Sequence, residues 1–73
     1  MVEEIRAAVQ RAVETNQKIA MFHFQVLKNA KELEDLNPKA FCKEIGVPES
    51  YATEFIKMIS LARVIDEQGM RLV

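Results

Sequence analysis

Apolar residues recur with helical spacing over almost the whole chain. From Val2 to about Leu33 there is neither glycine nor proline, and the apolar positions return every three or four residues, as on one face of an α-helix. This spacing predicts one long helix over residues 1–34. Thirty residues of helix would reach roughly 45 Å, whereas a globule of this chain length is only about 25–30 Å across. Either the helix breaks near residues 14–16, or a second copy of the chain packs along it.

The second half of the pattern contains two further helices, separated by a glycine. Asn37 suits an N-cap, and Pro38 is tolerated at the first helical position because its missing N–H would be unpaired there. Gly46 falls where the first of these helices must reverse, and glycine takes the left-handed conformation without strain. We therefore expect a helix-turn-helix with an extended third helix over residues 37–68, followed by a tail at residues 69–73.

Residues 19–27 are apolar nearly all round the predicted helix. A helix with one side exposed to solvent does not need apolar residues all round. We therefore expect this segment to form the centre of the core and also to contact a partner chain. The third helix also carries a second apolar strip, which exceeds one small core. The fold expected is a single all-α domain that forms a symmetric helical homodimer. The expected dimer interface comprises Ile19, Phe22, His23, Phe24, Leu27, Met58, Leu61 and Ile65.

The turn between the last two helices resembles the helix-turn-helix unit of bacterial and phage DNA-binding regulators. Cys42 is the small residue four positions before Gly46, Val47 is the branched apolar residue after it, and Ala52 and Phe55 match the anchors of the second helix. The resemblance implies that the second helix faces the major groove and the first lies near the phosphate backbone. The residues that it implies for DNA contact are Lys39, Lys43, Glu49, Ser50, Thr53, Glu54 and Lys57.

On this resemblance the chain is interpreted as a small dimeric protein of the transcriptional-regulator type that binds double-stranded DNA. The charge argues against this interpretation, because ten basic side chains are balanced by eleven acidic ones. Within residues 38–57, three lysines are likewise matched by three glutamates, which repel phosphate. The alternative is an adaptor, antitoxin-like protein or inhibitor that uses the same scaffold to bind another protein through its excess apolar surface.

Few residues of the chain suit catalysis or cofactor binding. His23 and Cys42 are the only residues of their types, which is too few for a metal site, and the two glycines each end a helix. We expect no enzyme, cofactor or metal. Cys42 is predicted to be a core residue in a reducing cytoplasm, and His23 to bond Asn16 or its copy across a two-fold axis. No apolar run is long enough to cross a bilayer, so we expect no membrane contact.

Overall fold

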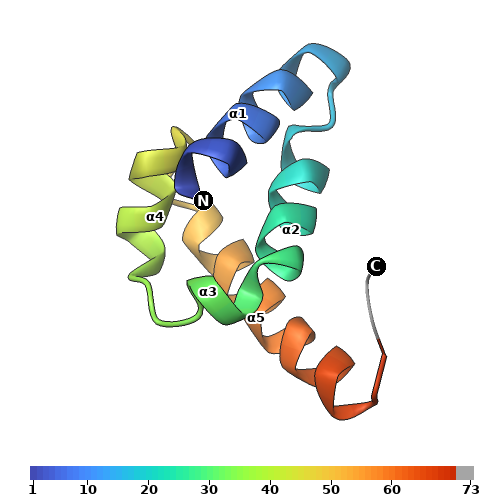
Figure 1. Ribbon diagram of the computed structural model, residues 1–73. Coiled ribbons are helices and arrows are strands. Elements are labelled where there is room, and N and C mark those ends of the chain that lie inside the picture. Colours follow the sequence, from blue (N-terminus) through green and yellow to red (C-terminus); the bar gives the residue numbers. More distant parts are fainter. Residues whose placement is uncertain (71–73) are drawn as a thin grey trace.

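The computed structural model describes residues 1–70, and this range is built from helices without any strand. The all-α fold is therefore confirmed. Residues 71–73 of the predicted tail lie outside the described residues. The elements are α1 (Val2–Ala12), a 3₁₀ turn η1 (Val13–Thr15), α2 (Lys18–Lys28), α3 (Ala30–Leu33), α4 (Pro38–Ile45) and α5 (Tyr51–Glu67) (Figure 1).

The amino-terminal segment is not the one long helix expected over residues 1–34. It breaks after η1, where Asn16 takes the left-handed conformation with φ 58° and ψ 29°. The N–H of Gln17 then donates to the carbonyl of Ala12 at 3.0 Å, which closes the turn. Asparagine is one of the few residues besides glycine that adopt this conformation readily. Of the two alternatives, the chain takes the break, and α1 folds back against α2 (Figure 1).

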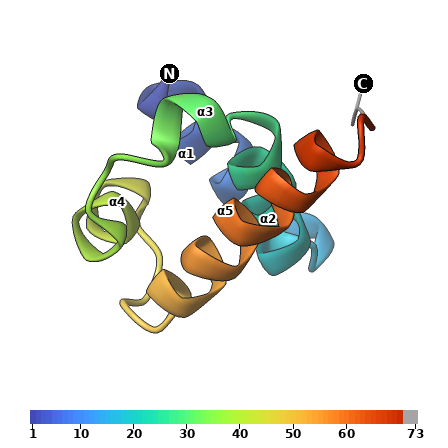
Figure 2. The same cartoon turned by 90° about the horizontal axis from the view of Figure 1, so that it is seen from below.

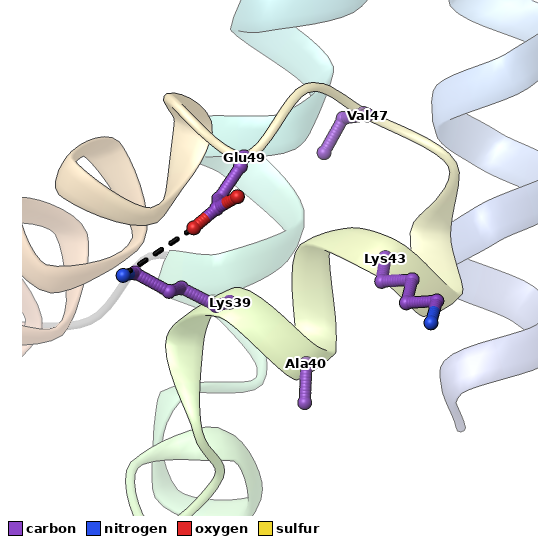
Figure 3. Close-up of a pocket in the computed structure, with 5 residues that line it drawn as sticks. All are labelled: Lys39, Ala40, Lys43, Val47 and Glu49. Atoms are coloured by element: carbon purple, nitrogen blue, oxygen red, sulfur yellow. Dashed lines mark ion pairs between the residues drawn. The ribbon is translucent and has the colours of Figure 1, made fainter.

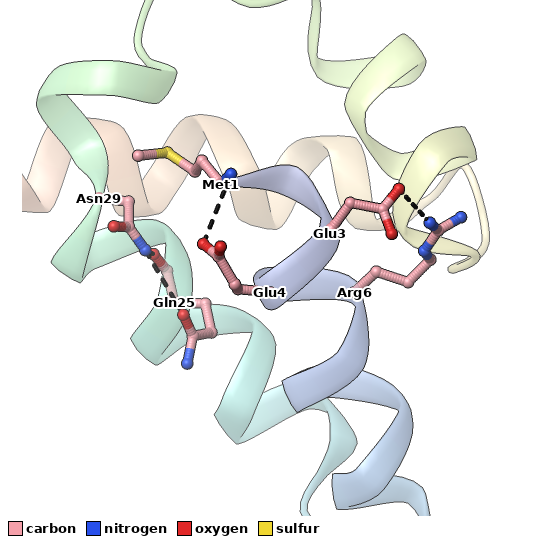
Figure 4. Close-up of polar contacts among 6 residues, drawn as sticks. All are labelled: Met1, Glu3, Glu4, Arg6, Gln25 and Asn29. Carbon is pink, nitrogen blue, oxygen red and sulfur yellow. Dashed lines mark hydrogen bonds and ion pairs between the residues drawn. The ribbon is translucent and has the colours of Figure 1, made fainter.

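A smaller irregularity separates α2 from α3. Asn29 leaves the helical conformation, with φ −107° and ψ 21°, and its side-chain amide donates to the carbonyl of Gln25 at 2.9 Å (Figure 4). Such side-chain bonds compete with the regular helical pattern and favour a break. The short α3 then changes direction and buries Leu33 in the core.

The first helix of the helix-turn-helix begins as the sequence predicts. Asn37 precedes α4, and its side-chain oxygen accepts the N–H of Ala40 at 3.0 Å. Pro38 occupies the first helical position. The cap satisfies a backbone donor that has no partner inside the helix.

The turn after α4 depends on Gly46, whose φ is 86°. The N–H groups of Gly46 and Val47 both donate to the carbonyl of Cys42, at 3.0 and 3.1 Å. A side chain at position 46 would also lie 3.3 Å from the amide nitrogen of Gln10. That nitrogen donates to the carbonyl of Ile45 at 3.1 Å, so α1 holds the end of α4.

A cluster of aromatic rings joins α2, α4 and α5. Phe22 lies 6.1 Å from Phe41 and 5.2 Å from Tyr51, between ring centroids, and meets Tyr51 edge-on at 79°. Phe41 in turn lies 5.0 Å from Phe55. Phe22 is fully buried, so the middle of α2 is at the centre of the core, as predicted. Because the rings come from three helices, they fix how α4 and α5 sit on α2.

Helix α5 is longer than the core that it covers. Its buried residues are Ala52, Phe55 and Ile59, all in its first half. The carboxyl-terminal turns of α5 extend beyond the other helices in two perpendicular views (Figures 1 and 2). There Leu61 and Val64 are 42% and 50% exposed. This end of α5 therefore presents apolar side chains that the described chain does not cover.

Substitutions of Asn16 test the break between α1 and α2. The left-handed conformation costs most residues about 1–2 kcal/mol, so Asn16→Ala should lower the free energy of unfolding by about 1 kcal/mol relative to Asn16→Gly. Urea denaturation followed by circular dichroism measures both variants. An uninterrupted helix would instead favour alanine over glycine by roughly 1 kcal/mol. An alanine variant as stable as the glycine variant, or more stable, would contradict the break.

Candidate nucleic-acid interface

The residues that the sequence indicates for DNA contact come together on one side of α4 and at the start of α5. Contact between Phe41 and Phe55 anchors the two helices by their buried sides, so the polar positions face outward. Ser50 precedes α5 but makes no capping bond with its side chain, which leaves its hydroxyl available. Glu54 is partly buried, whereas the exposed members are Lys39, Lys43, Glu49, Ser50, Thr53 and Lys57.

A hollow of about 390 Å³ lies between α4 and the turn that leads to α5. Lys39 and Glu49 stand on its rim, and the Lys39 ammonium lies 3.3 Å from a Glu49 carboxylate oxygen (Figure 3). Both side chains are well exposed to water, so their pair adds little to stability. Lys43, one turn further along α4, pairs with no carboxylate among residues 1–70. A phosphate would therefore meet Lys43 without competition but would compete with Glu49 for Lys39.

His23 contacts α5 instead of Asn16, which corrects the partner expected from the sequence. Its Nε2–H donates to one carboxylate oxygen of Glu54 at 2.8 Å, and the other oxygen lies 3.6 Å from the ammonium of Lys57. The His23 hydrogen bond, with help from Lys57, lowers the pKa of the Glu54 carboxyl below its ordinary value of 4.5, although partial burial opposes the shift. Glu54 is thus ionised at neutral pH, and both of its oxygens have protein partners.

The sequence did not indicate that Lys18 belongs to this region. Its ammonium lies 5.6 Å from the ring centroid of Tyr51, the first residue of α5. Such a position suits a cation–π contact, and it places a positive charge at the start of α5 on the side of α2. No local sequence pattern predicts the contact between Lys18 and Tyr51, because it requires the break at Asn16 and the packing of α2 on α5.

The side chains expected at a dimer interface have different environments. Phe22 is fully buried within its own chain and offers no surface to a partner, so it does not belong to that set. The others reach the surface: Ile19, Phe24 and Leu61 are exposed, and His23, Leu27, Met58 and Ile65 are partly buried.

Cys42 lies fully buried beneath the turn after α4. Burial raises the pKa of its thiol above 9.0, and the nearby Glu49 carboxylate adds to the shift. The thiol therefore stays protonated at neutral pH and serves as a small core side chain.

Two further observations concern residues 1–70. They bring no three His, Cys, Asp or Glu side chains together in a way that could hold a metal ion. No helix among them combines the length and apolar character needed to cross a bilayer.

The capped α4, the left-handed glycine turn and α5, packed on α1 and α2, define the class of protein: a helix-turn-helix-like domain. The chain belongs to the HTH-like domain family, whose family model matches residues 1–68. The match begins before α1 and extends past the end of α5, so the two amino-terminal helices are part of the family's domain. No curated protein and no solved structure matches the chain.

The network around Glu54 predicts how stability depends on pH. The carboxyl has a lower pKa in the folded chain than in the unfolded one, so its contribution is present above pH 4.5 and is lost as the pH falls through the folded-state pKa. Glu54→Gln should therefore show a weaker fall in stability below pH 4.5 than the wild type, measured by urea denaturation at several pH values.

Glu44→Gln is the matched control, because Glu44 is an exposed carboxylate of α4 that pairs with no residue in the range 1–70. An unchanged acid dependence in Glu54→Gln would show that the contacts with His23 and Lys57 do not favour the ionised carboxyl in the folded chain.

Proposed function

We propose that the chain is a DNA-binding protein of the transcriptional-regulator type, which contacts double-stranded DNA with α4 and the start of α5. One observation carries the proposal. The fold buries the apolar anchors of the helix-turn-helix and leaves exposed the side chains whose chemistry suits DNA. The membership of the chain in the HTH-like domain family supports it.

The exposed side chains divide by chemistry into two roles. Lys43 and Lys57 neutralise phosphates on either side of the groove, and such contacts position a protein without reading sequence. Ser50 and Thr53 carry hydroxyls that bond base edges or phosphates. Glu49 accepts a hydrogen bond from cytosine N4 once Lys39 turns to a phosphate. Any base preference therefore rests on the turn and the first two turns of α5.

The nearly equal numbers of acidic and basic side chains predict weak sequence-independent binding to DNA. Carboxylates that face a polyanion cost affinity, but Glu49 pairs with Lys39, and Glu54 pairs with His23 and Lys57. In the free chain each carboxylate therefore lies beside a lysine ammonium, and a phosphate that binds Lys39 or Lys57 competes with that carboxylate. We expect the affinity to be modest and to depend on the match between bases and side chains.

A second candidate function is the binding of another protein, as an adaptor, antitoxin-like protein or inhibitor. The exposed Leu61 and Val64 near the end of α5 favour it, together with Ile56, which is 55% exposed. Contiguous apolar patches on a protein surface often mark an interaction site, and Leu61 and Val64 are neighbours one turn apart on α5. Under this alternative, Met58→Asp abolishes partner binding, whereas lysine substitutions have little effect.

Charge reversal on the interface tests DNA binding. The double variant Lys43→Glu, Lys57→Glu removes two phosphate contacts, so the slope of log K against log salt should fall by about 1.8 and the affinity at low salt should drop at least tenfold. Fluorescence anisotropy with a labelled random-sequence duplex pool measures both quantities. Circular dichroism checks that the variant is folded.

The control is Lys28→Glu, Lys31→Glu, which changes the net charge equally on exposed positions of α2 and α3. It should retain most of the binding. Equal losses in the two double variants would show that α4 and α5 do not form the interface. A wild-type chain that binds no duplex even at low salt would contradict the proposed function, because phosphate attraction accompanies sequence-specific recognition.

A further inference from the structure

Helix α2 runs beside the first turns of α5, and the two helices point in the same direction. The Lys18 ammonium lies 5.6 Å from the ring centroid of Tyr51. Further along both helices, Nε2 of His23 lies 2.8 Å from a carboxylate oxygen of Glu54. An advance along α2 is thus matched by an advance along α5. The starts of both helices therefore lie on the same side of the domain, towards the lower edge of the view in Figure 2.

The exposed side of α5 lies between α4 and α2. Phe55 contacts Phe41 of α4, and Tyr51 contacts Phe22 of α2. At about 100° per residue, Thr53 points roughly 160° round the helix from Phe55 and from Tyr51. Figure 2 shows α4 on one side of α5 and α2 on the other. A duplex that contacts Thr53 therefore meets a flanking helix on either side of α5.

Each flanking helix carries a lysine that has no carboxylate partner. Lys43 on α4 and Lys18 on α2 pair with no carboxylate among residues 1–70. The other two lysines of the candidate interface each pair with a glutamate. A phosphate can therefore bind Lys18 or Lys43 without displacing an acidic side chain.

The ring of Tyr51 holds the Lys18 ammonium in place without neutralising it. A cation–π contact attracts a cation to the face of an aromatic ring, and the cation keeps its full charge. Phe22 is fully buried and meets the Tyr51 ring edge-on at 5.2 Å between centroids, so the core fixes the ring. Lys18 is itself partly buried. Because its side chain is already confined, it loses less freedom on binding a phosphate than a lysine on an open surface would.

We propose that Lys18 is a further DNA-contact residue, which binds a backbone phosphate on the α2 side of α5 while Lys43 binds one on the α4 side. This proposal rests on the proposed function, because it adds a contact to the same interface. It extends that interface to a helix that the helix-turn-helix resemblance does not include. The two lysines position the start of α5 between two phosphate contacts and read no bases themselves.

Neutralising Lys18 tests the contact. Lys18→Gln should lower the slope of log K against log salt by about 0.9, the value for one phosphate, in fluorescence anisotropy with the random-sequence duplex pool. Lys18→Arg keeps the charge and should retain the wild-type slope. A lysine that only stabilised the start of α5 would behave differently, because its loss would weaken binding without changing the slope. That result would overturn the proposal.

Lys28→Gln is the matched control. Lys28 belongs to the same helix, and its ammonium likewise lies near an aromatic ring, 5.9 Å from the centroid of Phe24. It is about 15 Å further along α2 than Lys18, away from the start of α5. Its loss should leave the slope unchanged. Equal reductions in Lys18→Gln and Lys28→Gln would reveal an effect of net charge alone and would also overturn the proposal.

Lysine acetylation of the wild-type chain tests the contact without any substitution. An acetylating reagent modifies accessible amines, and mass spectrometry measures the extent of modification at each lysine with and without duplex. The duplex should protect Lys18 and Lys43 and leave the reactivity of Lys28 unchanged. Protection of Lys43 without protection of Lys18 would show that the α2 side does not meet DNA, and the proposal would then be wrong.

The outcomes separate failure of this contact from failure of the proposed function. A wild type that binds duplex, with a slope that falls in Lys43→Glu, Lys57→Glu but not in Lys18→Gln, would keep DNA binding by α4 and α5 and exclude Lys18. A wild type that binds no duplex even at low salt would contradict the proposed function and overturn the Lys18 contact with it.

Discussion

The arrangement of the domain depends on Phe22, the buried ring in the middle of α2. Its contacts with Phe41 and Tyr51 hold α4 and α5 against α2, and Phe41 also contacts Phe55. Aromatic rings bury a large apolar area and prefer tilted or edge-on contact, so this cluster both holds and orients the helix-turn-helix. Since the buried side of α5 is fixed there, its outer side is fixed as well.

The same packing decides the electrostatics of the candidate interface. With α2 held against α5, His23 reaches Glu54 and Lys18 reaches Tyr51. Both contacts bring a basic side chain of α2 to the first turns of α5. One acidic residue of the helix-turn-helix, Glu54, therefore has a hydrogen-bond partner on a helix outside the unit. The family model likewise covers the amino-terminal helices as well as the helix-turn-helix.

Local signals allowed much of this structure to be predicted from the sequence. Asn37, Pro38 and Gly46 act through their own backbone preferences, so the start and end of α4 follow from neighbouring residues alone. Asn16 is different, because asparagine permits the left-handed conformation without requiring it, and the burial gained when α1 folds back selects it. The partner of His23 could not be predicted either, since it lies on a helix more than thirty residues away.

Helix α5 carries two different surfaces along its length. Its first half is held by Phe55 and carries polar residues outward, while its second half extends past the core with Leu61 exposed. A helix is stiff over this length, so whatever binds the second half determines where the first half points. A partner bound to the second half would therefore fix the orientation of the proposed DNA-contact surface on the first half.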